Sequence, residues 1–325
     1  MNNYKAILVG HGTMGKRHKA QFEACGVQFI KVLDSKAGKR CAESIAANSC
    51  NEIDCIPFSE YAFVDDSEAD FVVIASPAST HYSYVKQYLK QRIPVFVEKP
   101  LATTAAEAQE LVDLAKEYGT TLFVAQSECF NPIFLNFRKQ MVSELKMAAR
   151  NDEGKINLRL EFRREHAYSE RCRDVSVALD LMVHDLSMFL TLFNYDNVKI
   201  ENFVNNGDDE SWAFLRVVSG EYAGVEACLK VNRNSSKDVR TITASFDDAE
   251  YIVSLAKYMR NGEVDHIADS LQNGFFSFHN FWKMRQTFYN ILTQIRIICR
   301  KSFYQNRYRF LFFHQTDCFC RIHSN

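Results

Sequence analysis

A glycine-rich turn near the amino terminus constrains the fold more than any other feature of the sequence. The apolar stretch Ala6–Val9 leads into Gly10–Gly15 (GHGTMG), and a basic segment with helical character follows. In a strand–turn–helix unit the first glycine permits a tight turn. The second lets the backbone approach phosphate, and the third lets the helix pack closely on the strand. The free N–H groups of the helix also favour an anion. The residues predicted to bind a dinucleotide pyrophosphate are Gly10, Gly12, Thr13, Met14 and Gly15.

The residue after the next apolar stretch indicates which dinucleotide is bound. Gln28–Leu33 has the pattern of a second buried strand and ends at Asp34. A carboxylate at this position accepts hydrogen bonds from the adenosine ribose hydroxyls and repels a 2′-phosphate, which favours NAD over NADP. The alternative is that Asp34 only ends a strand at a turn. The basic residues Lys36, Lys39 and Arg40 follow and would attract a 2′-phosphate.

Strand and helix patterns alternate through the first third of the chain. Phe71–Ala75 and Val95–Val97 are predicted strands, and a further apolar strand is predicted at Leu122–Ala125. The predicted helices between them are His81–Lys90 and Ala105–Glu117. This order is typical of a doubly wound parallel sheet, whose ligands bind beyond the carboxyl ends of the strands. The residues at those ends, which we expect near the cofactor, are Ser76, Pro77, Glu98, Lys99 and Pro100.

The composition is that of an ordinary globular protein. A chain of 325 residues exceeds the usual single-domain range, so we expect two domains. A net charge of −1 gives no global case for binding nucleic acid or membrane. The amino terminus lacks a signal-peptide pattern, and no apolar stretch approaches the ~20 residues of a membrane span. We therefore expect a cytoplasmic protein with small-molecule partners.

The cysteines do not indicate a metal or a disulfide framework. The chain has 10 of them, scattered singly and without CxxC spacing. Cys318 and Cys320 would bind a metal only with ligands from elsewhere in the chain. We expect most of the cysteines to be reduced packing residues, and we expect no metal.

The middle third alternates apolar and polar residues in the way typical of a sheet covered on one face. Its predicted strands are Lys155–Phe162, Trp212–Val218, Gly224–Val231 and Arg240–Phe246. From about Phe275 the chain becomes rich in Phe, Arg and Tyr and nearly lacks acidic residues. Three interpretations of this segment stay open. It is an amphipathic tail that binds a membrane surface or nucleic acid, a divergent carboxyl end, or the product of a shifted reading frame.

Several motifs resemble the Gfo/Idh/MocA family of nicotinamide-dependent sugar and cyclitol oxidoreductases. They are the initial GHGTMGKRH, the segment from Pro77 to His81, and VFVEKPLA, whose Glu98-Lys99-Pro100 resembles the EKP signature of the family. The resemblance covers about the first 250 residues. It implies that His81 contacts the cofactor and that Lys99 lies between cofactor and substrate.

The resemblance also implies the domain organisation. A Rossmann domain is expected at residues 1–125, followed at 126–257 by an α+β domain with a large open, mainly antiparallel sheet. Residues 258–325 form an atypical basic and aromatic carboxyl-terminal segment. In the family such an open sheet joins subunits. We therefore expect a homo-oligomer, a dimer or a tetramer, with Trp212 and Phe214 either on that face or in the core.

Three titratable residues are predicted to be catalytic. Lys99 at a strand end can polarise a substrate oxygen, although a surface lysine paired with Glu98 explains the spacing equally well. Asp180 and His184 lie at i and i+4 of a predicted helix, so the carboxylate would orient the imidazole, which would accept the hydroxyl proton. A helix-face ion pair is the alternative. Resemblance to the DxxxHD element of the family favours catalysis, with Asp185 in a structural or substrate hydrogen bond.

Two segments resemble family members that act at C3 of nucleotide-linked sugars. Glu128–Pro132 resembles their ERFNP segment, with Cys129 in place of the arginine, and Arg173–Val175 precedes the Asp180 helix. The predicted substrate-binding residues are Asn131, Arg163, Arg173 and Asp185. Four arginines could supply the positive charge that a diphosphate needs: Arg163, Arg164, Arg171 and Arg173. We expect one or two of them to face the cleft and bind phosphate, and the others to be exposed charges.

The resulting hypothesis is an NAD-dependent oxidoreductase that transfers hydride between nicotinamide and a sugar hydroxyl, at C3 of a nucleotide-linked sugar. Two alternatives stay open: a dehydrogenase of free cyclitols or aldoses, and an NAD-binding sensor without turnover.

Overall fold

Two six-stranded sheets organise the chain. The structure is a computed structural model that describes residues 4–34, 55–56, 68–169, 173–193, 195–246 and 249–255. The predicted segment 258–325, with Cys318 and Cys320, lies outside the described residues. Within the described ranges, no helix combines the length and the apolar character needed to cross a membrane.

The first sheet is entirely parallel, with the strand order β3-β2-β1-β4-β5-β6. This is the order of a dinucleotide-binding Rossmann fold, whose strand order reverses beside β1. The strands are β1 (Lys5–Val9), β2 (Gln28–Leu33), β3 (Cys55–Ile56), β4 (Phe71–Ile74), β5 (Val95–Glu98) and β6 (Leu122–Ala125). The predicted doubly wound parallel sheet is thus confirmed.

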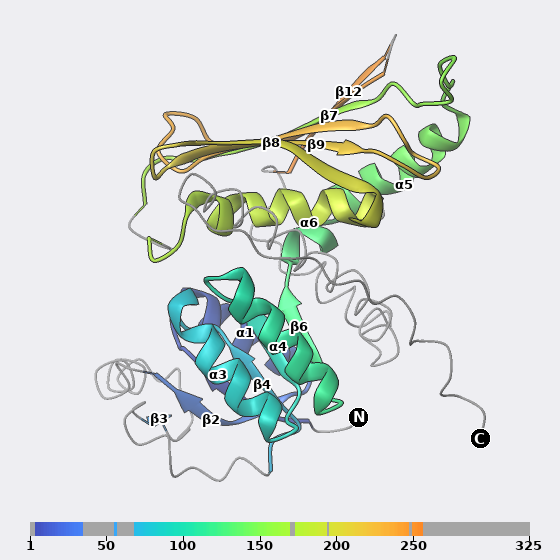
Figure 1. Ribbon diagram of the computed structural model, residues 1–325. Coiled ribbons are helices and arrows are strands. Elements are labelled where there is room, and N and C mark those ends of the chain that lie inside the picture. The colour runs from blue at the N-terminus through green and yellow to red at the C-terminus, as the bar shows by residue number, and fades with distance from the viewer. Residues whose placement is uncertain are drawn as a thin grey trace, which may run out of the picture.

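Helices α1 (Thr13–Ala24), α3 (Ala78–Lys90) and α4 (Ala105–Glu117) pack on this sheet (Figure 1). On α1, Phe22 packs against three phenylalanines of the sheet at centroid distances of 6.4, 5.4 and 5.3 Å: Phe29, Phe71 and Phe96. All six strands run in one direction, so the turns that carry the predicted cofactor residues leave the sheet at the same edge.

The second sheet is mixed, with the order β12-β11-β7-β10-β9-β8. Neighbouring strands are antiparallel except β7 and β10, which pair in parallel. The strands are β7 (Arg159–Glu165), β8 (Val198–Asn206), β9 (Glu210–Val217), β10 (Glu226–Asn232), β11 (Val239–Ser245) and β12 (Glu250–Ser254). The mainly antiparallel second sheet was correctly predicted, although β8, β12 and the parallel pairing were not.

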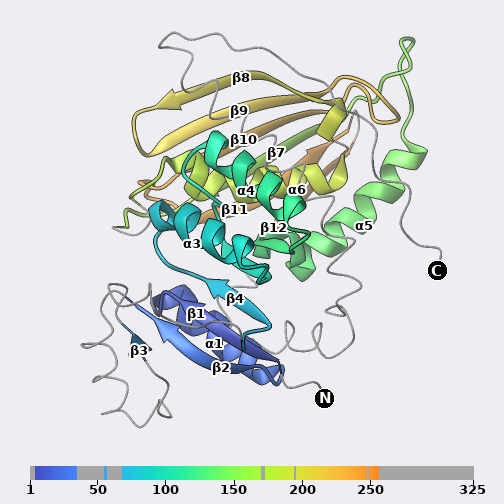
Figure 2. The same ribbon diagram turned by 60° about the horizontal axis from the view of Figure 1, so that its bottom comes forward.

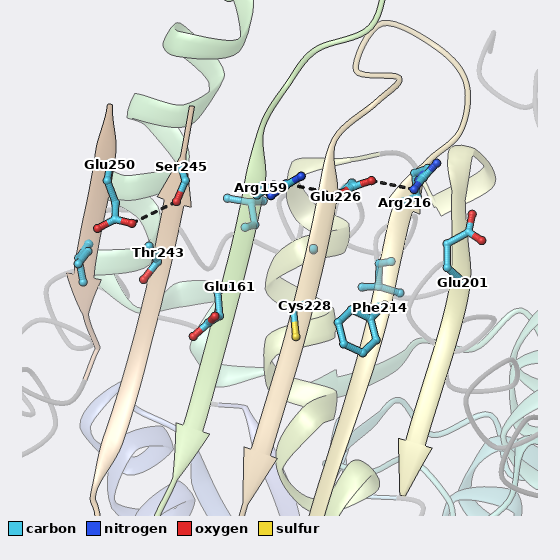
Figure 3. A pocket seen from close by; sticks show the side chains of 14 residues that line it. Arg159, Glu161, Glu201, Phe214, Arg216, Glu226, Cys228, Thr243, Ser245 and Glu250 are labelled. Carbon is cyan, nitrogen blue, oxygen red and sulfur yellow. Dashed lines mark hydrogen bonds and ion pairs between the residues drawn. The ribbon is translucent and has the colours of Figure 1, made fainter. Parts of the chain in front are cut away.

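One face of this sheet is covered and the other is open. Alternate side chains of β9 and β10 are buried, as the period of two in a strand requires. The remaining side chains lie on the open face, where Phe214 is 42% and Ile252 is 64% exposed. Figure 3 shows Phe214, Glu161 and Cys228 projecting from this face, where they line a shallow hollow. Trp212 also lies on the open face, beneath the Lys230 ammonium.

The covered face packs against α6 (Val183–Leu192), which continues a π-helical turn, η3 (Ala178–Met182). Figures 1 and 2 show α6 between the second sheet and the Rossmann sheet. The short helix η2 (Ser127–Phe130) and helix α5 (Pro132–Met147) lead from β6 to the second sheet, and η4 (Tyr195–Asn197) precedes β8. This arrangement brings η3 and α6 to the edge from which the Rossmann turns emerge.

Candidate functional site

The glycine turn is built as its spacing predicts. Gly10 has φ +91°, and a Cβ there would lie 2.5 Å from the backbone nitrogen of Ser76. A Cβ on Gly15 would lie 1.9 Å from the carbonyl oxygen of Gly10. Neither position can hold a side chain without moving backbone. The turn therefore brings strand, helix and the neighbouring β4 turn into the close approach that a dinucleotide site requires.

The remaining turn residues start the helix. Gly12 is the N-cap of α1 and makes no side-chain cap bond, and α1 begins at Thr13. Thr13 is exposed and Met14 is half-buried. The first N–H groups of α1 thus lie at the edge where β1 ends, which is the position for a phosphate group.

Asp34 belongs to the same site. Its Oδ2 accepts a hydrogen bond of 2.7 Å from the backbone N–H of His11, and the residue is 4% exposed. The carboxylate is therefore anchored against the glycine turn at the carboxyl end of β2. A crowded glycine turn and an adjacent acidic residue are together the features that fit a dinucleotide with free ribose hydroxyls.

His81 supports this edge from within the protein. Its Nδ1 lies 2.7 Å from the carbonyl oxygen of Pro100, and its Nε2 lies 2.9 Å from that of Ser76. The side chain is buried, and burial lowers its pKa. Both ring nitrogens face protein carbonyl oxygens, and the predicted cofactor contact stays a prediction. The ring joins the turn after β4 to the turn after β5.

Ser76 and Pro77 form the first of these turns. The Ser76 hydroxyl lies 2.7 Å from the hydroxyl of Thr80, and Pro77 is the N-cap of α3. An oxygen of Asp174, in the segment before η3, accepts a 3.1 Å hydrogen bond from the backbone N–H of Ser79. The turn after β4 is therefore also tied to the second half of the chain.

Glu98 points toward α1. Its Oε1 lies 2.5 Å from Nε2 of His18, and its Oε2 accepts a 3.1 Å hydrogen bond from the backbone N–H of Lys99. The carboxylate thus pairs with His18 and not with the Lys99 ammonium. The surface pair of Lys99 and Glu98, considered as an alternative from the sequence, is wrong.

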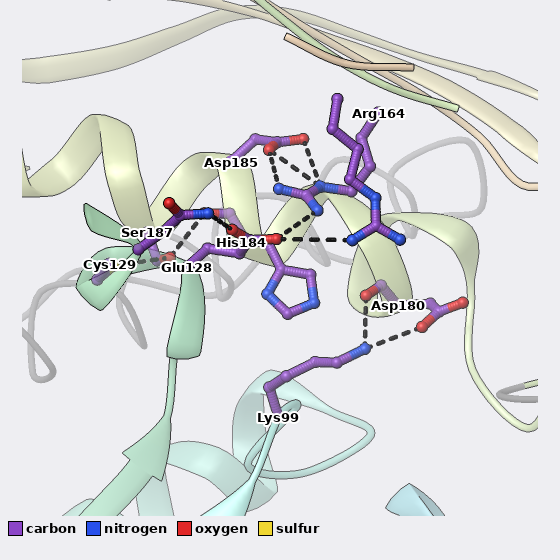
Figure 4. Close-up of polar contacts among 10 residues, drawn as sticks. Lys99, Glu128, Cys129, Arg164, Asp180, His184, Asp185 and Ser187 are labelled. Atoms are coloured by element: carbon purple, nitrogen blue, oxygen red, sulfur yellow. Dashed lines mark hydrogen bonds and ion pairs between the residues drawn. The ribbon is translucent and has the colours of Figure 1, made fainter. Parts of the chain in front are cut away.

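The Lys99 ammonium is held by Asp180 across the two halves of the chain. Nζ donates hydrogen bonds of 2.9 Å to Oδ1 and 2.7 Å to the main-chain oxygen of Asp180. The Lys99 side chain is only 15% exposed. Figure 4 shows Lys99 reaching from the Rossmann edge toward η3, with His184 projecting from α6 on the same side. The predicted trio is therefore brought together at the edge where the dinucleotide turn lies.

The predicted pairing of Asp180 with His184 is absent. Asp180 contacts Lys99 and, at 3.7 Å from Oδ2, Nη1 of Arg233. Nδ1 of His184 is buried with no hydrogen-bond partner among the described residues. The Asp180 carboxylate, in the π-helical turn over Ala178–Met182, is instead directed toward Lys99 and Arg233.

Desolvation determines the protonation state of His184. Burial lowers its pKa well below the ordinary range, and the positive charges of Lys99, Arg164 and Arg240 lower it further. The imidazole is therefore neutral at physiological pH and can accept a proton.

Comparison with known proteins agrees with this geometry. Residues 4–126 match the model of the oxidoreductase family Gfo/Idh/MocA, described as having an NAD-binding Rossmann fold. This match spans the Rossmann part of the chain. The first domain of the chain is thus an NAD-binding domain.

Named relatives of the chain include dehydrogenases of two kinds. A UDP-N-acetylglucosamine 3-dehydrogenase of Acidithiobacillus ferrooxidans is 24% identical over 74% of this chain and 71% of its own. An inositol 2-dehydrogenase of Acidothermus cellulolyticus is 29% identical over 58% of this chain. The chain spans only about half, 52%, of that second relative.

Solved structures share the fold of this chain. The 3-dehydrogenase GnnA of A. ferrooxidans superposes with a TM-score of 0.65 at 21% identity, covering 93% of this chain and 99% of that one. GenD2 from gentamicin A biosynthesis, in complex with NAD, has a TM-score of 0.70 at 16% identity, covering 94% and 96%.

A buried ionic network lies beside His184. Arg164 donates to Asp185 Oδ1 through Nη2 at 2.8 Å and to Glu128 Oε1 through Nη1 at 2.9 Å. All three residues are at most 6% exposed. Asn131 donates to Glu128 at 3.2 Å and caps α5 by accepting from the Ile133 N–H. These contacts use Asn131 and Asp185 structurally, and their predicted contacts with substrate stay predictions.

The four arginines considered from the sequence have different surroundings. Arg164 faces α6, whereas Arg163 lies on the open face with Glu161 and Glu165. The predicted substrate contact of Arg163 is wrong for this subunit, since alternate residues of a strand point to opposite faces. Arg173 pairs with Asp209 and lies over the Tyr168 ring at 4.3 Å. Arg171 lies outside the described residues.

Two arginines of the site were not found from the sequence. Arg233 donates from Nε to Asp209 at 3.0 Å and also reaches Asp180, so it joins the Lys99–Asp180 pair to Asp209. Arg240 lies near Glu128 and His184. Local patterns contain no signal for Arg233, because its partners are distant in the sequence. For Arg240 the sequence contains a weak signal. Arg240 alternates in step with the apolar Ile242 and Ala244 of the same strand, which predicts that all three point to one face.

Proposed function

We propose that this chain is an NAD-dependent dehydrogenase that moves hydride between nicotinamide and a sugar hydroxyl, at C3 of a nucleotide-linked sugar. The observation that carries the proposal is the Lys99 ammonium, fixed by Asp180 at the NAD-domain edge and facing the same region as a neutral His184. A lysine donor and a neutral imidazole are the two groups that oxidation of an alcohol needs.

Each residue has one task in the oxidation direction. His184 accepts the proton of the substrate hydroxyl, and the Lys99 ammonium stabilises the negative charge that develops on that oxygen. Asp180 holds the ammonium in place through two hydrogen bonds. NAD, when bound, supplies the hydride acceptor. The products are a ketone, NADH and the proton on His184.

The nucleotide-linked substrate is supported by the relatives and by charge. Both the sequence and the structure comparisons include UDP-N-acetylglucosamine 3-dehydrogenases. Arg173, whose side chain is 29% exposed, provides a guanidinium toward solvent at the end of the site network. A diphosphate is an ordinary partner for such a group. The competing candidate is a cyclitol dehydrogenase, which inositol 2-dehydrogenase relatives favour.

A substrate panel tests the proposal. Purified protein with NAD is mixed with UDP-N-acetylhexosamines, UDP-hexuronates, free aldoses and inositols, and NADH is followed by absorbance. We expect NADH with UDP-sugars only, lost in Lys99→Ala and retained in Lys116→Ala, a lysine 40% exposed on α4. Turnover of free inositol would favour the cyclitol candidate. NAD binding without turnover would favour a sensor and contradict the proposal.

We also propose that the open face of the second sheet joins two copies of the chain. Phe214 and Ile252 are exposed there beside Arg159, Arg216 and Glu226, so the face carries both apolar groups and charges of both signs. A two-fold axis would place each charge near its opposite on the other copy. Light scattering should give a dimer or tetramer that Phe214→Glu dissociates. Met147→Glu, 79% exposed on α5, should leave the mass unchanged. A monomeric wild type would contradict this proposal.

A further inference from the structure

Arg240 occupies a position beside the catalytic residues. It pairs in register with Arg164 across β11 and β7. Ile242 and Ala244, which share its strand parity, are fully buried on the face that packs against α6. The two arginines therefore extend on the same face, and Arg164 bonds Asp185, the neighbour of His184. The charge of Arg240 is close enough to help lower the pKa of His184.

The guanidinium of Arg240 makes no hydrogen bond to any residue that the structure describes. Its one charged contact is Glu128 Oε1 at 4.0 Å. That carboxylate is already bonded by Arg164 at 2.9 Å and by Asn131 at 3.2 Å. The Arg240 side chain is 27% exposed, so it is largely covered but reachable. Its planar set of five N–H donors is thus available to a ligand.

Among the described residues, Arg240 is the cation of this cluster that lacks a hydrogen-bonded anion. Two chains of contacts meet around His184, one through Asp185, Arg164, Glu128 and Arg240, the other through Lys99 and Asp180. The second chain continues through three further residues: Arg233, Asp209 and Arg173. In the first chain Arg164 donates hydrogen bonds to both carboxylates, so an anionic group of a ligand would be the first to pair closely with Arg240. Lys99 and His184 serve the reacting oxygen, which leaves Arg240 for another substrate group.

We propose that Arg240 binds a carboxylate of the substrate, so that the preferred substrate class is a sugar acid, a hexuronate, and not a neutral sugar. A guanidinium matches a carboxylate through two parallel N–H···O bonds. The inference rests on the proposed function, because it assumes that a sugar binds between Lys99 and His184. The competing explanation is that Arg240 only balances the charge of Glu128.

Binding to the NAD-loaded full-length protein separates these explanations. The probes are UDP-glucuronic acid and UDP-glucose, which differ only at carbon 6, and their dissociation constants are measured by calorimetry. The variants are Arg240→Gln, Arg240→Lys and, as a matched control, Arg138→Gln. Arg138 is an exposed arginine of helix α5, away from the open face of the second sheet. Arg240→Lys retains the charge in case Arg240→Gln fails to fold.

We expect the wild type to bind UDP-glucuronic acid at least about tenfold more tightly than UDP-glucose, since a charge-assisted pair typically has that effect. The preference should fall to about twofold or less in Arg240→Gln, be intermediate in Arg240→Lys and be unchanged in Arg138→Gln. An equal preference in wild type and Arg240→Gln would overturn the inference. So would equal affinities, or no binding, of the two sugars in the wild type.

Hydride transfer, measured on the same samples, distinguishes this inference from the proposed function. If binding depends on the carboxylate but no NADH forms, the role of Arg240 is supported and the dehydrogenase proposal is contradicted. Rapid NADH formation from UDP-glucose, unaffected by Arg240→Gln, would retain the dehydrogenase and overturn the carboxylate site.

Discussion

Lys99 donates hydrogen bonds to both the carboxylate and the main-chain oxygen of Asp180, at 2.9 and 2.7 Å. The pair connects the turn after β5 to the π-helical turn that begins the α6 region. The main-chain bond also fixes the ammonium independently of the carboxylate. The ammonium is therefore held by two different acceptor atoms of one residue, and a variant can separate the two bonds.

Asp180→Asn removes the charge but keeps an oxygen for Lys99. We expect kcat to fall up to about tenfold, because hydrogen bonds to charged groups contribute roughly 1.5–3 kcal/mol and neutral ones roughly 0.5–1.5 kcal/mol. The KM for NAD should hardly change. Steady-state kinetics would check this, with Asp113→Asn on exposed α4 as the control. A kcat equal to that of the wild type would show that the carboxylate is not needed.

The pH dependence of kcat/KM should report the neutral state of His184. Its pKa is lowered first by burial and then by the charges of Lys99, Arg164 and Arg240. A base with a lowered pKa stays active below pH 6.5, so the acidic limb should have its midpoint below that value. Arg240→Gln removes one cation and should move the midpoint upward. A midpoint above pH 7 in the wild type would contradict this assignment.

His81 should make the folded state sensitive to mild acid. Its pKa is lowered in the folded protein, mainly by burial, and is about 6.5 when the chain unfolds. The unfolded state then binds the proton more readily, so this contribution to stability is complete above pH 6.5 and is lost as pH falls toward the lowered value.

Urea unfolding at pH 7.5, 6.5 and 5.5 would measure this effect. The wild type should lose up to about 1.4 kcal/mol per pH unit more than His81→Gln below pH 6.5. At pH 7.5 the variant should be less stable by about 1–3 kcal/mol, since a buried carbonyl loses its donor. Parallel pH profiles for the two proteins would contradict the prediction.

Gly15→Ala should damage the NAD site more than the rest of the fold. The added Cβ would lie 1.9 Å from the Gly10 carbonyl oxygen, so the turn must shift. We expect NAD affinity to fall at least tenfold, measured by fluorescence titration. Gly119→Ala is the control, because a Cβ there meets nothing within 4 Å, although its φ of +62° adds some strain. Equal NAD affinity in the wild type and Gly15→Ala would refute the role given to the turn.

Local motifs predicted the cofactor half of the site well. The glycine turn, Asp34 and the strand ends at Ser76 and Glu98 depend on contacts between adjacent segments of a fold with a fixed strand order. Sequence spacing is informative there, because one strand–turn–helix unit determines where each residue lies. The strand bounds also agree closely, with β4 ending one residue before the predicted Ala75.

The second half was less predictable, because its contacts depend on register and on partners distant in the sequence. The i and i+4 spacing of Asp180 and His184 predicted a contact within one helix, whereas Lys99 and Arg233, which are distant in the sequence, contact the Asp180 carboxylate. Strand β7 begins at Arg159 and extends to Glu165, beyond the predicted end at Phe162. Arg164 therefore points to the same covered face as Leu160 and Phe162, whereas Arg163 points to the open face.

Transfer of a labelled hydride tests the central claim most directly. The protein would be incubated with NAD and a UDP-hexuronate that carries deuterium at C3, and the reduced cofactor would be analysed by mass spectrometry. We predict NADH that is one mass unit heavier, formed by the wild type and not by Lys99→Ala. Unlabelled NADH would contradict reaction at C3. Failure to form NADH from this or any other sugar would contradict the dehydrogenase itself.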